Sequence, residues 1–283
     1  MKTILIIMVY LIFAPLLGGL LAGIDRWISA RMQARFGPPI WQPFYDVLKL
    51  RQKENIVVRR SQNFYIFFFL LFIIFTGGLF FAGYDLLLVI FALTLAGIFF
   101  VLGAYKASSP YSFLGAEREL LQMMAYEPMV ILVAIGMYMV TGSFYIADIN
   151  SFPHPLLRYL PGLFLGFVFI LVIKFRKSPF DLSMSHHAHQ ELVRGIITEF
   201  SGKTLAWIEI AHWYENVFLL GIVYLFCASQ PLAGCLLALA VYFMVILVDN
   251  VFARLKWQTM LESSWAAAAV LGLGNIIVLH FLR

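Results

Sequence analysis

Long apolar stretches alternate with shorter polar segments along the whole 283-residue chain. Residues 64–82, for example, contain no charged side chain. A helix of about 20 apolar residues crosses a bilayer core of roughly 30 Å. The pattern therefore predicts an all-α, polytopic integral membrane protein in which residues 1–283 form a single transmembrane domain. About eight spans are expected, at 3–24, 64–82, 86–105, 121–146, 159–175, 204–227, 232–252 and 263–282.

A shorter amphipathic pattern follows the first apolar stretch. Ile24, Ile28, Met32 and Phe36 recur every four residues, with arginines beside them. This spacing predicts a helix lying at the membrane interface, its cations directed toward lipid headgroups or a docked protein. A solvated surface helix is the alternative. Residues 37–39, Gly-Pro-Pro, should end the helix because proline lacks the backbone donor that a helix needs.

Basic residues are concentrated in four of the predicted loops. Of the 20 lysines and arginines, 17 fall in loop 25–63, before the fourth span, or after the fifth and seventh spans. Those loops all lie on one side if the spans alternate, and an excess of Lys and Arg marks the cytoplasmic side. We expect both termini outside and two long polar loops, 25–63 and 176–203, in the cytoplasm.

Composition agrees with a membrane protein and excludes some other classes. The chain is 62% hydrophobic and 12% charged, whereas a typical soluble domain is about 25% charged. The net charge of +5 follows the loops and so does not predict nucleic-acid binding. The two cysteines, Cys227 and Cys235, form no C-x-x-C motif, which excludes a local iron–sulfur or zinc-finger ligand set. We interpret both as small apolar side chains.

Several titratable residues lie inside predicted spans. In the sixth span, Glu209, His212 and Glu215 follow one another at intervals of three, which predicts positions roughly along one side of a helix. An ionised carboxylate at such depth costs several kcal/mol unless it is paired, hydrated or protonated. The residues therefore predict a proton path, with a structural polar network as the alternative. The candidates for the path are Glu127, Glu199, Glu209, His212, Glu215 and Asp249.

Three histidines, His186, His187 and His189, crowd the loop between the fifth and sixth spans. Imidazole is a common ligand of zinc, copper and nickel. Neighbouring helical residues diverge by about 100°, so only His186 and His189 could share an ion, and the favoured i, i+4 spacing is missing. The spacing disfavours a metal site. A proton-handling or docking surface and a purely structural loop both stay open.

Several blocks, in the same order, resemble the complex I membrane subunit that forms the floor of the quinone site. Residues 33–54 resemble its Q-x-R-x-G-P, Q-P-x-x-D-x-x-K-L and K-E loop, and residues 118–127 resemble its R-x-x-x-Q-x-x-x-Y-E segment. Residues 178–182 and 191–202 resemble its PFDL and ELV-x-G…EYSG blocks. The resemblance covers nearly the whole chain and agrees with eight spans.

Two departures from that pattern are informative. Between PFDL and ELV the quinone-reducing subunits carry a short acidic stretch, whereas this chain has S-M-S-H-H-A-H-Q. This form is similar to the equivalent subunit of energy-converting [NiFe] hydrogenases of the Ech and formate hydrogenlyase types. The sixth span also departs where the family keeps A-E-Y. Loss of the acidic stretch leaves quinone binding in question, while the docking role of the first loop is retained.

The resemblance implies a non-catalytic anchor and coupling subunit in the plasma membrane of a prokaryote, linking redox chemistry to movement of H⁺ or Na⁺. It implies no cofactor or metal in this chain. The [NiFe] centre and iron–sulfur clusters would belong to partners: hydrogenase large and small subunits, an iron–sulfur subunit and antiporter-like membrane subunits. The implied docking and coupling residues are Arg35, Asp46, Lys49, Glu54, Arg118, Asp181, His186, His187, His189, Glu191 and Arg194.

Two other functions remain to be weighed. One is a quinone- or methanophenazine-site subunit of a complex I-like oxidoreductase. The other is a stand-alone ion transporter, which would more often show inverted halves and helices broken at mid-membrane. The sequence shows neither feature.

Overall fold

The computed structural model describes residues 2–54, 60–184 and 192–281, and its regular structure within them is helical apart from one isolated bridge between Asp85 and Tyr145. The last three elements follow one another without a break, so they form one long rod with a π-helical middle. The elements are α1 (Lys2–Met32), α2 (Gln42–Gln52), α3 (Arg60–Phe81), α4 (Leu86–Tyr105), α5 (Pro110–Thr141), α6 (Ile146–Asn150), η1 (Leu156–Arg158), α7 (Pro161–Lys174), η2 (Gly195–Ile197), α8 (Gly202–Leu225), α9 (Pro231–Val251), α10 (Trp257–Ala267), η3 (Ala268–Leu273) and α11 (Gly274–Phe281).

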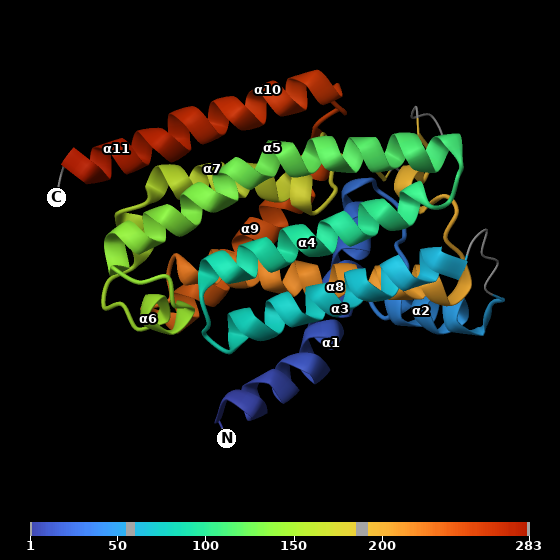
Figure 1. Cartoon of the computed structure of the whole chain (residues 1–283), viewed down its shortest axis with the longest axis horizontal. Helices are drawn as coiled ribbons and strands as arrows, with labels where there is room; N and C mark the ends of the chain where they lie inside the picture. The colour runs from blue at the N-terminus through green and yellow to red at the C-terminus, as the bar shows by residue number, and fades with distance from the viewer. Residues whose placement is uncertain (1, 55–59, 185–191, 282–283) are drawn as a thin grey trace.

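The helices form a bundle in which α8 is central. It packs against α1, α2, α3 and α9, while α4 packs between α3 and α5. Figure 1 shows α10 and α11 along one edge, beside α5 and α7, and the first half of α1 leaving the bundle at the opposite edge. The core is therefore built from the middle of the chain, and the two ends of the chain lie on its outside.

Six of the described helices are long and apolar enough to cross a membrane: Thr3–Met32, Ser61–Phe81, Leu86–Tyr105, Pro110–Thr141, Pro231–Val251 and Trp257–Phe281. Together they confirm a polytopic membrane protein. The predicted fifth span corresponds to α7, which is apolar but has only 14 residues. The predicted sixth span corresponds to α8, which carries Glu209 and Glu215. The count of eight spans stays a prediction.

The structure corrects two predicted boundaries. The interfacial helix is not a separate element, because α1 continues unbroken to Met32; residues 24–32 contain neither glycine nor proline that would interrupt its hydrogen bonds. The polar segment before the fourth span is also helical, since α5 begins at Pro110. Proline at the first helical position is favoured there because its missing N–H would have no intrahelical partner.

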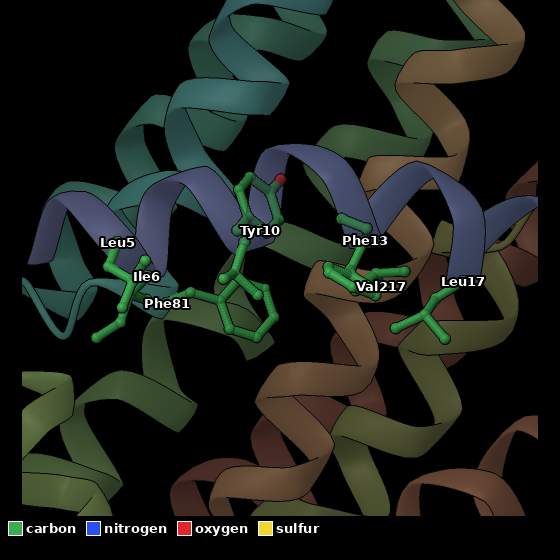
Figure 2. Close-up of a pocket in the computed structure, with 9 residues that line it drawn as sticks. Leu5, Ile6, Tyr10, Phe13, Leu17, Phe81 and Val217 are labelled. Carbon is green, nitrogen blue, oxygen red and sulfur yellow. The ribbon is translucent and has the colours of Figure 1, made fainter. Parts of the chain in front are cut away.

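The first half of α1 has a surface suited to hydrocarbon. Leu5, Val9 and Phe13 lie about half exposed, and they line an apolar cavity of about 330 Å³ together with Phe81 of α3 and Val217 of α8 (Figure 2). An exposed apolar helix is unfavourable in water but not in lipid. This surface is what a helix on the lipid-facing side of a membrane bundle requires.

A side chain from the last helix caps α7. The residue before α7, Leu160, offers no side-chain cap. Instead, Oδ1 of Asn275 accepts a hydrogen bond from the N–H of Leu163 at 3.1 Å, and its Nδ2 donates to the carbonyl of Tyr159 at 3.2 Å. The first N–H groups of a helix have no intrahelical acceptor, so Asn275 replaces a local N-cap and ties α11 to α7.

We expect Asn275→Ala to lower the free energy of unfolding by about 1 kcal/mol, the usual cost of losing an N-cap side chain. The thermal melting midpoint of the purified protein in detergent would measure this. Asn275→Asp is the control, because it keeps an acceptor for Leu163 and should melt above the alanine variant. Equal midpoints for all three proteins would contradict a capping role.

Candidate functional site

The loop that follows α7 connects several helices through charged side chains. We call residues 175–184 the junction loop; it contains Arg176, Lys177, Asp181 and Ser183. Arg176 has a φ of 52°, in the left-handed region. A non-glycine residue held there costs on the order of 1–3 kcal/mol and persists only where surrounding contacts fix it. Those contacts are ion pairs to two different helices.

A cluster of four charges surrounds Arg176. We call Glu119 of α5, Lys174 of α7, Arg176 and Glu215 of α8 the buried charge cluster. The guanidinium of Arg176 contacts Glu119 at 2.9 Å and Glu215 at 3.3 Å, and Nζ of Lys174 contacts the other Glu215 oxygen at 3.2 Å. The second oxygen of Glu119 accepts a hydrogen bond from Ser183. The cluster therefore ties the junction loop to α5, α7 and α8.

The cluster is electrically balanced, with two cations and two carboxylates. The side chains of Lys174 and Glu215 are only 8% and 4% exposed, so water contributes little to their solvation. Burial disfavours the charged guanidinium of Arg176, but Glu119 and Glu215 outweigh that effect and raise its pKa above the ordinary value. Nζ of Lys174 also lies 4.1 Å above the ring of Tyr126, a favourable position for a cation.

A second ion-pair group joins the junction loop to the first and ninth helices. Nζ of Lys177 lies 2.5 Å from Asp25 of α1 and 3.2 Å from Asp249 of α9. Asp249 also accepts a hydrogen bond from the N–H of Ser178 at 2.8 Å. Burial disfavours charged Lys177, yet the two carboxylates outweigh it and raise the pKa of Lys177 above its ordinary value. Lys177 thus links helices that are more than 200 residues apart in sequence.

Further contacts hold the rest of the junction loop. Arg254, after α9, lies 3.5 Å from the buried carboxylate of Asp181. The side-chain amide of Gln122 on α5 donates to the carbonyl of Phe180 at 2.5 Å. The carbonyl of Ser183 accepts a hydrogen bond from Ile196 at 3.0 Å. The chain on either side of residues 185–191 is therefore tied together.

Close packing of α5 on η2 depends on a glycine. A Cβ placed on Gly115 would overlap the backbone of Gly195 and Ile196. Only hydrogen at this position allows α5 to approach η2, which in turn is bonded to Ser183 of the junction loop. Gly115 is thus part of the seat of the loop.

We expect Gly115→Ala to lower the melting midpoint, because the added methyl group must displace backbone rather than a flexible side chain. Gly78→Ala is the matched control, since Gly78 is also helical and a Cβ there would meet nothing within 4 Å. Alanine is favoured over glycine in helices by about 1 kcal/mol, so Gly78→Ala should be neutral or stabilising. Similar midpoints for the two variants would contradict this role of Gly115.

A second polar site lies where α1, α2 and α8 meet. We call it the basic cavity; its volume is about 330 Å³. Arg26 on α1 pairs with Asp46 on α2 at 2.6 Å. Apolar residues of α2 and α8, among them Val47 and Trp213, complete the lining. The charged lining residues are Arg26, Asp46, Lys49, Lys53, Arg194 and Glu209.

The structure separates residues that the sequence pattern placed together. Glu215 belongs to the buried charge cluster, whereas Glu209 lines the basic cavity. Six helical residues turn by about 600°, which leaves the two carboxylates roughly 120° apart around α8. His212 lies between the rings of Phe69 and Phe100, with ring centroids 6.0 Å from each. The three titratable residues therefore do not face one common path.

The other predicted site residues are dispersed. Glu127 on α5 is half-buried, and its Oε1 has no hydrogen-bond partner. Glu199 is half-buried between η2 and α8, and Arg118 lies on α5. Arg35 is exposed and donates to the side chain of Gln33 at 2.8 Å. Glu54 is exposed just beyond α2.

The histidine segment lies outside the described residues, and with it His186, His187, His189 and Glu191. Over residues 2–54, 60–184 and 192–281, no group of three or more His, Cys, Asp or Glu side chains is arranged to hold a metal ion. Cys227 and Cys235 are free thiols.

Sequence reasoning missed five residues of the two ion-pair groups. Lys174, Arg176 and Lys177 entered it only as loop cations, and Asp25 and Glu119 did not enter it at all. Lys174 offered a usable signal, because a lysine that ends an apolar helix needs a buried counter-charge. No comparable signal identified the partners, since they lie on other helices.

Known proteins are similar to this chain over nearly its full length. Residues 3–280 match the family described as NADH dehydrogenase. Hydrogenase-4 component C of Escherichia coli is 30% identical over 280 residues, covering 87% of this chain and 86% of that protein. A membrane component of the NADH-quinone oxidoreductase of Syntrophotalea carbinolica is 28% identical over 295 residues, covering 90% and 88% respectively.

A solved structure has the same fold. It is a chain of the membrane-bound sulfane sulfur reductase, described as an archaeal respiratory membrane complex. The TM-score is 0.88 at 23% identity, and the match covers 99% of this chain and 100% of that one. The shared fold extends to the whole chain.

Proposed function

The chain belongs to the NADH dehydrogenase family of membrane proteins, and from that premise we propose that it is the anchor and coupling subunit of an energy-converting [NiFe] hydrogenase. It holds a soluble redox arm on its basic face and links electron transfer and H₂ chemistry to translocation of H⁺ or Na⁺. The similarity to Hydrogenase-4 component C favours a hydrogenase partner. The buried charge cluster is the observation that carries the coupling role.

The proposed topology has eight spans, with both termini outside and the junction loop and basic cavity on the cytoplasmic side of a prokaryotic plasma membrane. The loop bias of 17 among 20 cations supports this orientation. The partners are hydrogenase large and small subunits, an iron–sulfur subunit and antiporter-like membrane subunits. Those partners hold the [NiFe] centre and the clusters, and this chain docks them without a cofactor of its own.

The junction loop provides a physical route for coupling. An arm that docks over the loop and shifts it moves Arg176 relative to Glu119 and Glu215. A carboxylate that loses its partner at this depth costs several kcal/mol unless it takes up a proton. Displacement of one loop is thereby converted into a change of charge inside the bundle. Glu127, Glu199, Glu209, His212 and Asp249 are the further candidates for passing protons from it.

A quinone- or methanophenazine-reducing complex is the second candidate, favoured by the similarity to part of an NADH-quinone oxidoreductase. Purification of the tagged chain from its native membrane distinguishes the two. The hydrogenase proposal expects nickel- and iron–sulfur-containing partners and H₂-linked ion uptake by vesicles. Quinone reduction without hydrogenase activity would support the second candidate. A chain that is isolated alone and still moves ions would be a stand-alone transporter and would reject both.

Glu209→Gln tests the ion path separately from assembly. We expect the variant to assemble fully but to move several-fold fewer ions per H₂, because the amide cannot exchange a proton near neutral pH. Glu262→Gln is the matched control, since Glu262 is exposed on α10. Ion uptake and hydrogenase activity of the same vesicles give the ratio. An unchanged ratio for Glu209→Gln would remove Glu209 from the path.

A further inference from the structure

We propose that the basic cavity binds the phosphate group of an anionic phospholipid. Its lining carries four cations, Arg26, Lys49, Lys53 and Arg194, against two carboxylates, Asp46 and Glu209. Arg26 and Asp46 already pair with each other at 2.6 Å. Two lysines and an arginine therefore face the cavity against one remaining carboxylate, and the site has an uncompensated positive charge that an anion would neutralise.

The position of the cavity suits a lipid headgroup. Arg26 directly follows the apolar part of α1, so the cavity opens where that helix reaches the membrane boundary. The remaining lining includes Val47, Leu205 and Trp213, which supply an apolar floor beneath the cations. Tryptophan and basic side chains together are typical of this boundary. A phosphate at the cationic rim with carbon chains on the apolar floor satisfies both parts of the lining.

The backbone at Arg194 supports a binding role. Its φ of 62° and ψ of −20° place a non-glycine residue in the left-handed region, just before η2. Such conformations carry strain and cluster at ligand-binding positions. Here the strained residue contributes its side chain to the cavity lining. Guanidinium groups bind phosphate oxygens through paired N–H donors.

The cations of α2 also converge on the cavity. Lys49 and Lys53 are four residues apart, at the end of α2 and its C-cap, and both line the cavity. Residues at this spacing share one face of a helix, whereas Arg51 lies on the opposite face. The inference requires only that the chain sits in a membrane, so it is independent of the proposed hydrogenase role.

Lipid retention by the purified complex tests the inference. The complex in detergent is incubated with phosphatidylglycerol or with phosphatidylcholine and washed, and the retained lipid is quantified by mass spectrometry. Wild type should retain phosphatidylglycerol and not phosphatidylcholine. Lys49→Gln with Lys53→Gln should weaken retention roughly 10- to 30-fold, from the loss of two cations at a membrane surface. Arg51→Gln with Lys106→Gln, which removes two exposed cations elsewhere, should retain lipid like wild type.

Arg194→Gly separates binding from folding, because it removes a cation while relieving backbone strain. It should lose phosphatidylglycerol without a lower melting midpoint. Equal retention by cavity and control variants, or equal retention of phosphatidylcholine, would overturn the proposal. Displacement of the lipid by excess inorganic phosphate would assign the site to free phosphate instead. Loss of soluble partners from the cavity variant, with lipid retention unchanged, would make the cavity a protein interface and likewise overturn it.

Discussion

Glu215→Ala is expected to destabilise the protein by about 3–5 kcal/mol, the largest effect of any single substitution proposed, because it leaves buried cations without their counter-charge. Lys174 is 8% exposed and would keep the ring of Tyr126 but lose its ion pair. Arg176 would keep Glu119 alone. The thermal melting midpoint and the yield of assembled complex in detergent would measure the loss.

The matching double variant shows whether the charge pair or the packing is responsible. Lys174→Met with Glu215→Met removes one charge of each sign and leaves Arg176 paired with Glu119. Replacing a complete buried ion pair by apolar residues of similar volume is often neutral or stabilising. The double variant should therefore melt well above Glu215→Ala. A double variant no more stable than the single one would show that the ion pair is not the source of the effect.

Lys177→Met is expected to cost about 2–3 kcal/mol and to loosen α1 from α9, because Asp25 and Asp249 would then face each other without a cation. The loss is smaller than at Glu215, since the three side chains are 14–23% exposed and water shields them in part. Melting midpoints report the stability. A cysteine cross-link between α1 and α9 that forms less efficiently would report the loosening.

Lys177→Arg is the control, because it keeps the charge and should lose much less stability. The pH dependence of the wild-type protein gives a second check. The pKa of Lys177 is raised above its ordinary 10.5, so its contribution is fully present below that value and is lost only as pH rises through the raised pKa. Between pH 7 and about pH 9 the difference between wild type and Lys177→Met should stay constant. A difference that shrinks across that window would contradict a charged Lys177.

Hydropathy determined most of the fold because each membrane helix satisfies its own backbone hydrogen bonds. Where an apolar run was long and uninterrupted, as in α3, α4 and α9, the predicted and observed ends differ by only a few residues. The prediction was less accurate where polarity and helicity disagree. Charges before the fourth span indicated a loop, yet Glu119 is buried on α5 and paired with Arg176.

The sequence alone also identified Glu215 and Asp249 as buried charges that need partners, since the cost of an unpaired charge depends only on its surroundings being apolar. It could not identify Lys174 and Lys177 as those partners. Each pair joins residues on helices 41 and 72 positions apart, and a hydropathy pattern contains no information on which helices touch. The left-handed backbone at Arg176, which places one guanidinium between two helices, is likewise a consequence of tertiary contacts. The spans and their titratable residues are thus determined locally, whereas the assignment of Glu215 to the buried charge cluster and Glu209 to the basic cavity was decided only by the packing around α8.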